Sequence, residues 1–362
     1  MDCEKLIKKE DKMRLSRNEL KTLMKNKMMA AGLKEEHAEV TAEILTWSHE
    51  RGYASHGAVR VEYYSERIFK GGITTEPNFT WKETGPCSGI LDGDNGIGYV
   101  VAQEGMKKAI EMAKKNGVAV VGMANMSHSG SIGYYSEMAA KEDLVAITFC
   151  QSDPMAVPYG GTEPYYGTNP ISFAAPTADE RTVVFDMATT VQAWGKILDK
   201  RSKGASIPAD WAVDEKGAPV TDPHLVNALV PIAGAKGYGL MMMVDIFSGV
   251  LLGVPFGKHV SSMYHDLSQG RCLGQMHIVI DPEKFVGLEK FKQSMSQVCD
   301  ELGEMPAAEG YGKVYYPGER AVMRRDKAYA EGGIEVVDEL VEYLRSDAIH
   351  FDRYDHKNRF AD

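Results

Sequence analysis

The sequence lacks the usual markers of a secreted or disulfide-rich protein. Its five cysteines are widely spaced over 362 residues, and no two of them form a C-x-x-C pair that would suggest zinc or a redox dithiol. The first dozen residues, MDCEKLIKKEDK, are charged throughout and lack the apolar centre of a secretory signal. We therefore expect a protein of the reducing cytoplasm.

Acidic residues outnumber basic residues. The chain has 41 Lys and Arg residues against 51 Asp and Glu residues, which gives a formal net charge of −10 at pH 7. Nucleic-acid binding depends on cations that neutralise phosphates, so nucleic acid is a poor candidate partner.

The longest apolar stretch, residues 239–257, contains Asp245 and Pro255, and we expect a buried helix followed by a turn there. No membrane partner is expected.

The glycine-rich signatures of nucleotide-binding proteins are missing as well. The nearest approach to G-x-G-x-x-G is Gly96-Ile-Gly98-Tyr-Val-Val, which has no third glycine and is more simply explained as a turn. No P-loop, internal repeat or low-complexity segment occurs. These motifs alone therefore indicate no nicotinamide site.

Helical periodicity dominates the beginning of the chain. Ser16 and Glu19 have the spacing of a capping box, and apolar residues then recur at helical spacing until Gly32. A second helix is predicted from about Glu35 to His49. The chain should therefore open as a helical hairpin.

The length suits two packed domains. We expect residues 13–80 to form a helical domain that is completed by about 250–362, and residues 81–249 to form an α/β domain. The last part, from Gly333, predicts one amphipathic helix, VVDELVEYLRSD, and a polar tail.

The α/β part alternates predicted strands at 117–122, 144–150 and 182–185 with helices over 101–115 and 131–141. Ligands in open α/β sheets tend to lie beyond the carboxyl ends of strands. Three polar clusters fall at such ends: Ser127-His128-Ser129, Gln151-Ser152-Asp153, and Asp186.

His128 is the candidate proton acceptor. It lies in a strand-to-helix loop between two serines, just before Gly130, so a ligand can approach its ring without a bulky neighbour. Imidazole takes up a proton near neutral pH, because its ordinary pKa is about 6.5. The alternative is a purely structural histidine in a loop.

A second cluster, Ser55-His56-Gly57 with Arg60 and Tyr64, has the composition of a carboxylate site. If a helix resumes after Gly57, Arg60 and Tyr64 share one face at i, i+4 spacing. An arginine fork beside a histidine or tyrosine is suited to a substrate carboxylate. An interdomain ion pair or a solvated helix face would explain the same residues.

A metal site is the competing explanation for the histidines and carboxylates. His56, His128, Asp153 and Asp186 could supply ligands, but no two lie at the short spacings of zinc motifs, and we expect no metal. A metal-dependent hydrolase and a non-catalytic dinucleotide-binding protein remain as alternatives of other classes.

Several segments, in the same order, resemble the type-2 malate and L-lactate dehydrogenase family. The likeness runs from about Met13 to the end and leaves residues 1–12 as an extension. The segments are ERGYASHGAVRVEYYSERI, MSHSG, CQSDPMAVPYGG, YYGTNP, VVFDMATTVQAWGKI, AKGYGLMMMVD and VSSMYHDLSQGR.

This resemblance implies a fold and a reaction. The fold would be α/β, with a mixed-sheet nicotinamide-binding domain unlike the Rossmann fold and a largely helical second domain, and the active site would lie between them. The reaction would be hydride transfer from a small 2-hydroxy acid to NAD, which we prefer to NADP, in a homodimer. Sister enzymes of the family act on malate, lactate or related acids, or reduce cyclic imines.

The resemblance also assigns roles to residues. His128 matches the catalytic acid/base, and Ser55, His56, Arg60 and Tyr64 match the substrate motif. Lys236 sits in a glycine-flanked loop, where it could meet a phosphate or ribose or could be a plain surface lysine. The positions that match cofactor contacts are Ser152, Asp186, Met187, Ala188, Lys236 and, in a less distinctive late segment, Gly318 and Glu319.

The chain departs from the family at one point. Many members have A-N-S where this chain has Cys150-Gln151-Ser152, followed by Asp153. A carboxylate accepts hydrogen bonds only, so our hypothesis is that Asp153 helps to select a substrate that carries N–H donors. An Asp-Pro turn that ends the strand would explain Asp153 equally well.

Overall fold

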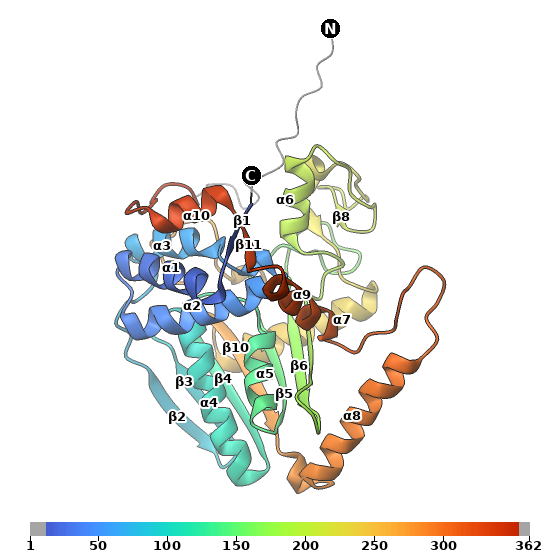
Figure 1. The fold of residues 1–362 in the computed structure, drawn as a ribbon. Helices are drawn as coiled ribbons and strands as arrows, with labels where there is room; N and C mark the ends of the chain where they lie inside the picture. Colours follow the sequence, from blue (N-terminus) through green and yellow to red (C-terminus); the bar gives the residue numbers. More distant parts are fainter. Residues whose placement is uncertain (1–11, 355–362) are drawn as a thin grey trace.

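A seven-stranded mixed sheet forms the centre of the computed structural model, which describes residues 12–354 (Figure 1). Its strands lie in the order β2-β3-β4-β10-β5-β6-β7. They span Thr80–Gly85 (β2), Ser88–Asp92 (β3), Val118–Met126 (β4), Val145–Cys150 (β5), Ile171–Pro176 (β6), Thr182–Met187 (β7) and Leu273–Ile280 (β10).

Strand direction brings the predicted polar clusters together. β10 lies between β4 and β5 and is antiparallel to both, so β4 and β5 run the same way. β5, β6 and β7 form an antiparallel meander, so β7 runs parallel to β5. The carboxyl ends of β4, β5 and β7 therefore share one edge of the sheet, as expected from the three clusters. Asp186 lies within β7, one residue before its end.

Helices cover both faces of the sheet. α4 (Gly98–Asn116) and α5 (Gly133–Lys141) cover one face, and α7 (Ala235–Ser248) covers the other. Successive strand residues point to opposite faces. In β5, Ala146 packs in the large core beneath α4 and α5, while Phe149 packs in a separate core against α7.

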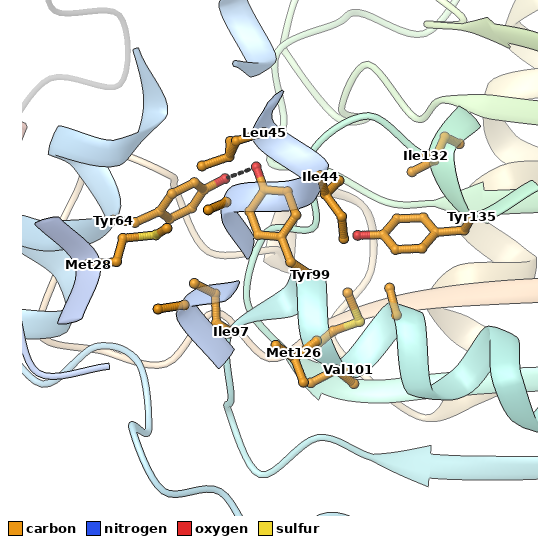
Figure 2. Packing of buried hydrophobic residues seen from close by; sticks show 14 of the residues in the cluster. Met28, Ile44, Leu45, Tyr64, Ile97, Tyr99, Val101, Met126, Ile132 and Tyr135 are labelled. Carbon is orange, nitrogen blue, oxygen red and sulfur yellow. Dashed lines mark hydrogen bonds between the residues drawn. The ribbon is translucent and has the colours of Figure 1, made fainter. Parts of the chain in front are cut away.

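The N-terminal helices extend the large core away from the sheet. Ser16 caps the first helix by accepting a hydrogen bond from the Glu19 N–H at 3.2 Å, but the Glu19 carboxylate pairs with Arg345, so only half of the capping box forms. Figure 2 shows the hydroxyl groups of Tyr64 and Tyr99 facing each other in this core, to which Tyr135 of α5 also belongs. The helices are α1 (Arg17–Ala30), α2 (Glu35–Glu50), the 3₁₀ turn η1 (Ala54–His56) and α3 (Arg60–Phe69).

A small lobe and a projecting arm complete the molecule (Figure 1). The lobe has its own apolar cluster, and the arm is helix α8 with the loop that follows it. The lobe contains α6 (Trp194–Ser202), β8 (Ala212–Val213), η2 (Pro223–Leu225) and β9 (Ala228–Leu229), and further segments are η3 (Val250–Leu252), η4 (Gly257–His259), η5 (Pro282–Lys284), α8 (Leu288–Glu304) and α9 (Glu319–Ala330).

Two expectations for the C-terminal part are wrong. β10 stands in the middle of the sheet, so residues 273–280 belong to the α/β layer and not to the helical part. The stretch after Gly333 is not one helix, because it begins as β11 (Ile334–Val337) before α10 (Asp338–Arg345). β-branched residues favour the strand, and β11 pairs antiparallel with β1 (Lys12–Leu15). Most of the predicted extension lies outside the described residues, but Lys12 belongs to β1.

The apolar stretch around α7 is less buried than expected. Only 33% of residues 235–252 are buried, although within residues 12–354 this is the one helix that passes a test of length and composition for a membrane span. One face packs against the sheet, and buried Asp245 accepts a hydrogen bond from the Gly257 N–H at 2.9 Å. The other face exposes Met242 and Ile246.

Candidate active site

A cavity of about 300 Å³ opens where the carboxyl ends of β4, β5 and β7 lie together. Its walls come from η1 and α3, from the loops after β4 and β5, from the end of β7 and from the start of α6. Nine of the predicted site residues line it: Ser55, His56, Arg60, His128, Ser152, Asp153, Asp186, Met187 and Ala188.

The loop that carries His128 is held by its neighbours. Ser127 Oγ accepts a hydrogen bond from the Gly98 N–H at 2.9 Å, and Ser129 Oγ donates to Gln275 Oε1 at 2.6 Å. Both serines are buried, while the His128 ring is partly accessible through the cavity. The serines that flank His128 in the sequence therefore fix the loop and leave the imidazole for a ligand.

His128 is tied to two tyrosines behind the cavity. Its Nδ1 lies 2.5 Å from the Tyr64 hydroxyl, which lies 3.0 Å from the Tyr99 hydroxyl. Among residues 12–354, the other ring nitrogen, Nε2, has no hydrogen-bond partner and remains for a ligand. Tyr64 is fully buried and does not line the cavity, so it contacts His128 instead of the substrate space.

Electrostatics keep His128 neutral. Desolvation by the surrounding protein, together with the positive charges of Arg60 and Arg271 and the nearby His56, lowers the pKa of His128 well below its ordinary value. Burial and Arg60 likewise lower the pKa of His56 to about 3. A neutral imidazole at physiological pH can accept a proton, which is the state that a general base requires.

Arg60 brings positive charge to the cavity. Its Nε donates to the Ser55 carbonyl at 2.7 Å and its Nη1 donates to the Tyr264 hydroxyl at 2.8 Å. No carboxylate of residues 12–354 pairs with it. A deep guanidinium without a protein anion can bind the carboxylate of a substrate, and its planar fork fits both oxygens.

Asp153 is engaged by the protein itself. Its Oδ1 pairs with Arg271 Nη2 at 3.3 Å, and its Oδ2 accepts from the Met263 N–H at 3.1 Å. Both charged side chains are almost fully buried. Asp153 therefore compensates Arg271 and anchors the segment that carries Met263 and Tyr264. Recognition of substrate N–H groups by Asp153 stays a prediction, and it would add a donor to oxygens that already have partners.

A second set of residues offers the surface that a nicotinamide ring requires. Ser152 Oγ accepts from the Thr168 N–H at 2.8 Å, and Asp186 Oδ2 accepts from the Gly133 N–H at 2.8 Å. Burial raises the pKa of Asp186 to about 6. Hydroxyl and carboxyl groups beside the apolar Met187 fit a planar ring that carries an amide. The residues present are therefore compatible with a nicotinamide cofactor.

Three predicted cofactor residues lie outside this cavity. Lys236 is exposed in the first turn of α7. Gly318 packs on Val184 of β7 and faces a small neighbouring cavity, and Glu319 forms an ion pair with Lys313. A dinucleotide is longer than the main cavity, so these assignments stay predictions about its outer part.

The sequence reasoning missed other residues of the site. Tyr264 and Arg271 lie in the segment VSSMYHDLSQGR, which was recognised only as part of a resemblance, and their spacing carried no signal of its own. Tyr99 lies far from His128 in sequence and meets it only through the fold. Tyr53, Thr168, Trp194, Leu198 and Met263 also line the cavity.

Known proteins share this architecture across nearly the whole chain. Ureidoglycolate dehydrogenase (NAD⁺) of Escherichia coli K12 is 56% identical over 96% of this chain and 100% of its own length. Malate/(S)-sulfolactate dehydrogenase of Methanothermus fervidus is 38% identical over 91% and 96%. The solved sulfolactate dehydrogenase of Methanocaldococcus jannaschii superposes with a TM-score of 0.86 at 34% identity, covering 92% of this chain and 96% of that one.

Fold and relatives together define an oxidoreductase with a mixed-sheet, non-Rossmann architecture, as the sequence resemblance implied. The profile of the malate/L-lactate dehydrogenase family matches residues 15–345. The chain belongs to this family.

Proposed function

We propose that this protein oxidises (S)-ureidoglycolate to oxalurate with NAD⁺, as a step of allantoin breakdown in the cytoplasm. One observation carries the proposal. This chain is 56% identical to ureidoglycolate dehydrogenase (NAD⁺), and it places His128 and Arg60, which has no carboxylate partner among the described residues, around one cavity. The four cysteines of the described chain are free thiols, which supports a reducing compartment.

The residues can carry out this chemistry. Arg60, with Ser55 and His56 beside it, binds the substrate carboxylate and so fixes the carbinol carbon. His128 Nε2 accepts the proton of the hydroxyl group as the C–O bond becomes a carbonyl. A nicotinamide held by Ser152, Asp186 and Met187 would supply the hydride acceptor, so that the alcohol would lose one hydride and one proton in total.

A substrate panel tests the proposal. NADH absorbance is followed with ureidoglycolate, malate and lactate, and its loss with pyruvate, using NAD and NADP in turn, with and without chelator. We expect kcat/KM for ureidoglycolate with NAD⁺ to exceed the others by at least about tenfold, the lower end of the discrimination that a substrate pocket produces. A preference for malate or lactate would identify a sister enzyme, and loss of activity to the chelator would indicate metal chemistry.

We also propose that the protein is a homodimer in which a second copy covers the exposed apolar face of α7 and η3. Met242, Ile246 and Val250 recur at helical spacing on that face, and the arm of α8 projects from the same molecule with exposed apolar residues of its own (Figure 1). Sedimentation should give twice the chain mass, and Ile246→Glu should give the monomer. A monomeric wild-type protein would refute the dimer.

A further inference from the structure

Tyr99 is a fully buried residue in the first turn of α4 that the proposed chemistry does not yet use. Its hydroxyl faces that of Tyr64, as the dashed line in Figure 2 shows, at 3.0 Å. Tyr64 in turn contacts His128 Nδ1. The three groups form a chain that runs from the core to the cavity.

The surrounding backbone is shaped to admit the Tyr99 ring. Gly130 follows the His128 loop with φ +73°, and a Cβ at this position would lie 2.6 Å from the Tyr99 hydroxyl and 2.5 Å from its ring. The rings of Tyr64 and Tyr99 also pack edge to face, with centroids 5.4 Å apart. Tyr99 is therefore held in one place beneath the loop.

The contact with Tyr64 determines which nitrogen of His128 can carry the imidazole hydrogen. A neutral imidazole has one N–H, so Nε2 can accept the substrate proton only when Nδ1 carries the hydrogen and donates it to Tyr64. The Tyr64 hydroxyl must then send its own hydrogen elsewhere. Within residues 12–354, Tyr99 is the one other hydrogen-bond partner of that hydroxyl.

We propose that Tyr99 is a positioning residue that sets the tautomer of His128 through Tyr64. Either hydroxyl can be the donor at 3.0 Å, and in the proposed arrangement Tyr64 donates to Tyr99. Tyr64 then accepts from Nδ1–H, and Nε2 is free to take a proton. Without the Tyr99 hydroxyl, Tyr64 donates to Nδ1, and the hydrogen of the imidazole moves to Nε2, where it blocks proton uptake. The inference rests on the proposed function, in which His128 accepts the hydroxyl proton.

A double-mutant cycle tests the route through Tyr64. We expect Tyr99→Phe to lower kcat about 10- to 100-fold, because a wrong histidine tautomer disables a general base, while KM for substrate and NAD⁺ changes less than about twofold. In a Tyr64→Phe background the same change should have no further effect, because the route is already broken. Additive losses would show that Tyr99 acts through packing and would overturn the proposal.

The tautomer itself is read by ¹⁵N NMR of histidine-labelled protein without substrate or cofactor, with His128→Gln to assign the signal. We expect Nδ1–H for His128 in the wild type, Nε2–H in Tyr99→Phe, and no change in Tyr135→Phe. Tyr135 is the matched control, because its buried hydroxyl donates to the Ser129 carbonyl of the same loop.

An Nε2–H tautomer in the wild type, or an Nδ1–H tautomer that survives Tyr99→Phe, would refute the proposal. The wild-type spectrum can refute the proposal by itself, even if Tyr99→Phe does not fold. Because the spectrum needs no turnover, its result is separate from a failure of the proposed function, which the substrate panel would reveal.

Discussion

The side chains of this site have two kinds of role: some are available to bind a ligand, and others hold the surrounding structure in place. Arg60 reaches the cavity without a protein carboxylate, whereas Arg271, slightly deeper, is paired with Asp153. Leaving a charge unpaired at such depth is costly unless a ligand supplies the counter-ion. The two arginines therefore have different roles: Arg60 is available for a substrate anion, and Arg271 is part of the framework.

Replacing Arg60 with lysine should weaken substrate binding selectively. Lysine keeps the charge but loses the planar fork and the bond to Tyr264, so we expect KM for the substrate to rise about tenfold or more while NADH affinity stays within about twofold. Steady-state kinetics and NADH fluorescence titration measure both quantities. An unchanged KM together with a collapse of NADH affinity would place Arg60 on the cofactor.

The Asp153→Asn variant distinguishes a structural role of Asp153 from a role in substrate recognition. The change leaves the buried Arg271 guanidinium without its counter-charge, so we expect the free energy of unfolding to fall by about 3 kcal/mol, with similar losses of kcat/KM for ureidoglycolate and malate. Urea denaturation and kinetics with the two substrates supply the comparison. A loss confined to ureidoglycolate at unchanged stability would instead support our hypothesis that Asp153 recognises the substrate.

Strand β10 places a titratable histidine, His277, in the middle of the sheet. His277 is fully buried, with its ring nitrogens at 2.9 Å from Thr148 Oγ1 and 3.1 Å from the Ala102 carbonyl, and burial lowers its pKa to about 4. Because the folded protein favours neutral His277, the low pKa of this residue adds to the free energy of unfolding at pH values above the unfolded pKa of about 6.5. This added stability is lost as the pH falls towards 4, where His277 takes up a proton in the folded protein as well.

Wild-type protein should therefore lose up to about 3 kcal/mol of unfolding free energy through His277 alone between pH 6.5 and pH 4. His277→Gln should show a shallower decline, since glutamine does not titrate. Urea unfolding at several pH values gives both slopes, and identical slopes would mean that His277 does not titrate in this range.

Local patterns predicted the elements whose signals are local. Ser16 marked the start of α1, and the strand-end clusters at His128 and Asp186 were placed correctly because strand periodicity shows where the chain leaves the sheet. β10 was missed, since its partners β4 and β5 lie more than 100 residues earlier. β11 was missed because the helical period of the following residues was extended back over it.

At the scale of the whole molecule, the site is a product of topology. β10 separates β4 from β5, yet leaves both with their carboxyl ends at one edge, where the N-terminal helices add Arg60 and the small lobe closes the other side. Contacts such as Asp153 with Arg271, or His128 with Tyr64, join distant parts of the chain. Sequence spacing alone cannot predict them, although the family resemblance identified His128 and Tyr64.

We propose that His128 accepts the hydroxyl proton of a hydroxy acid, with NAD⁺ as the hydride acceptor. The most direct measurement is NADH formation from ureidoglycolate by the wild type and by His128→Asn, with NADH binding followed in parallel by fluorescence. We expect a fall in kcat of about 10²- to 10⁴-fold with NADH affinity and melting temperature unchanged. Near-normal turnover by His128→Asn at neutral pH would contradict it.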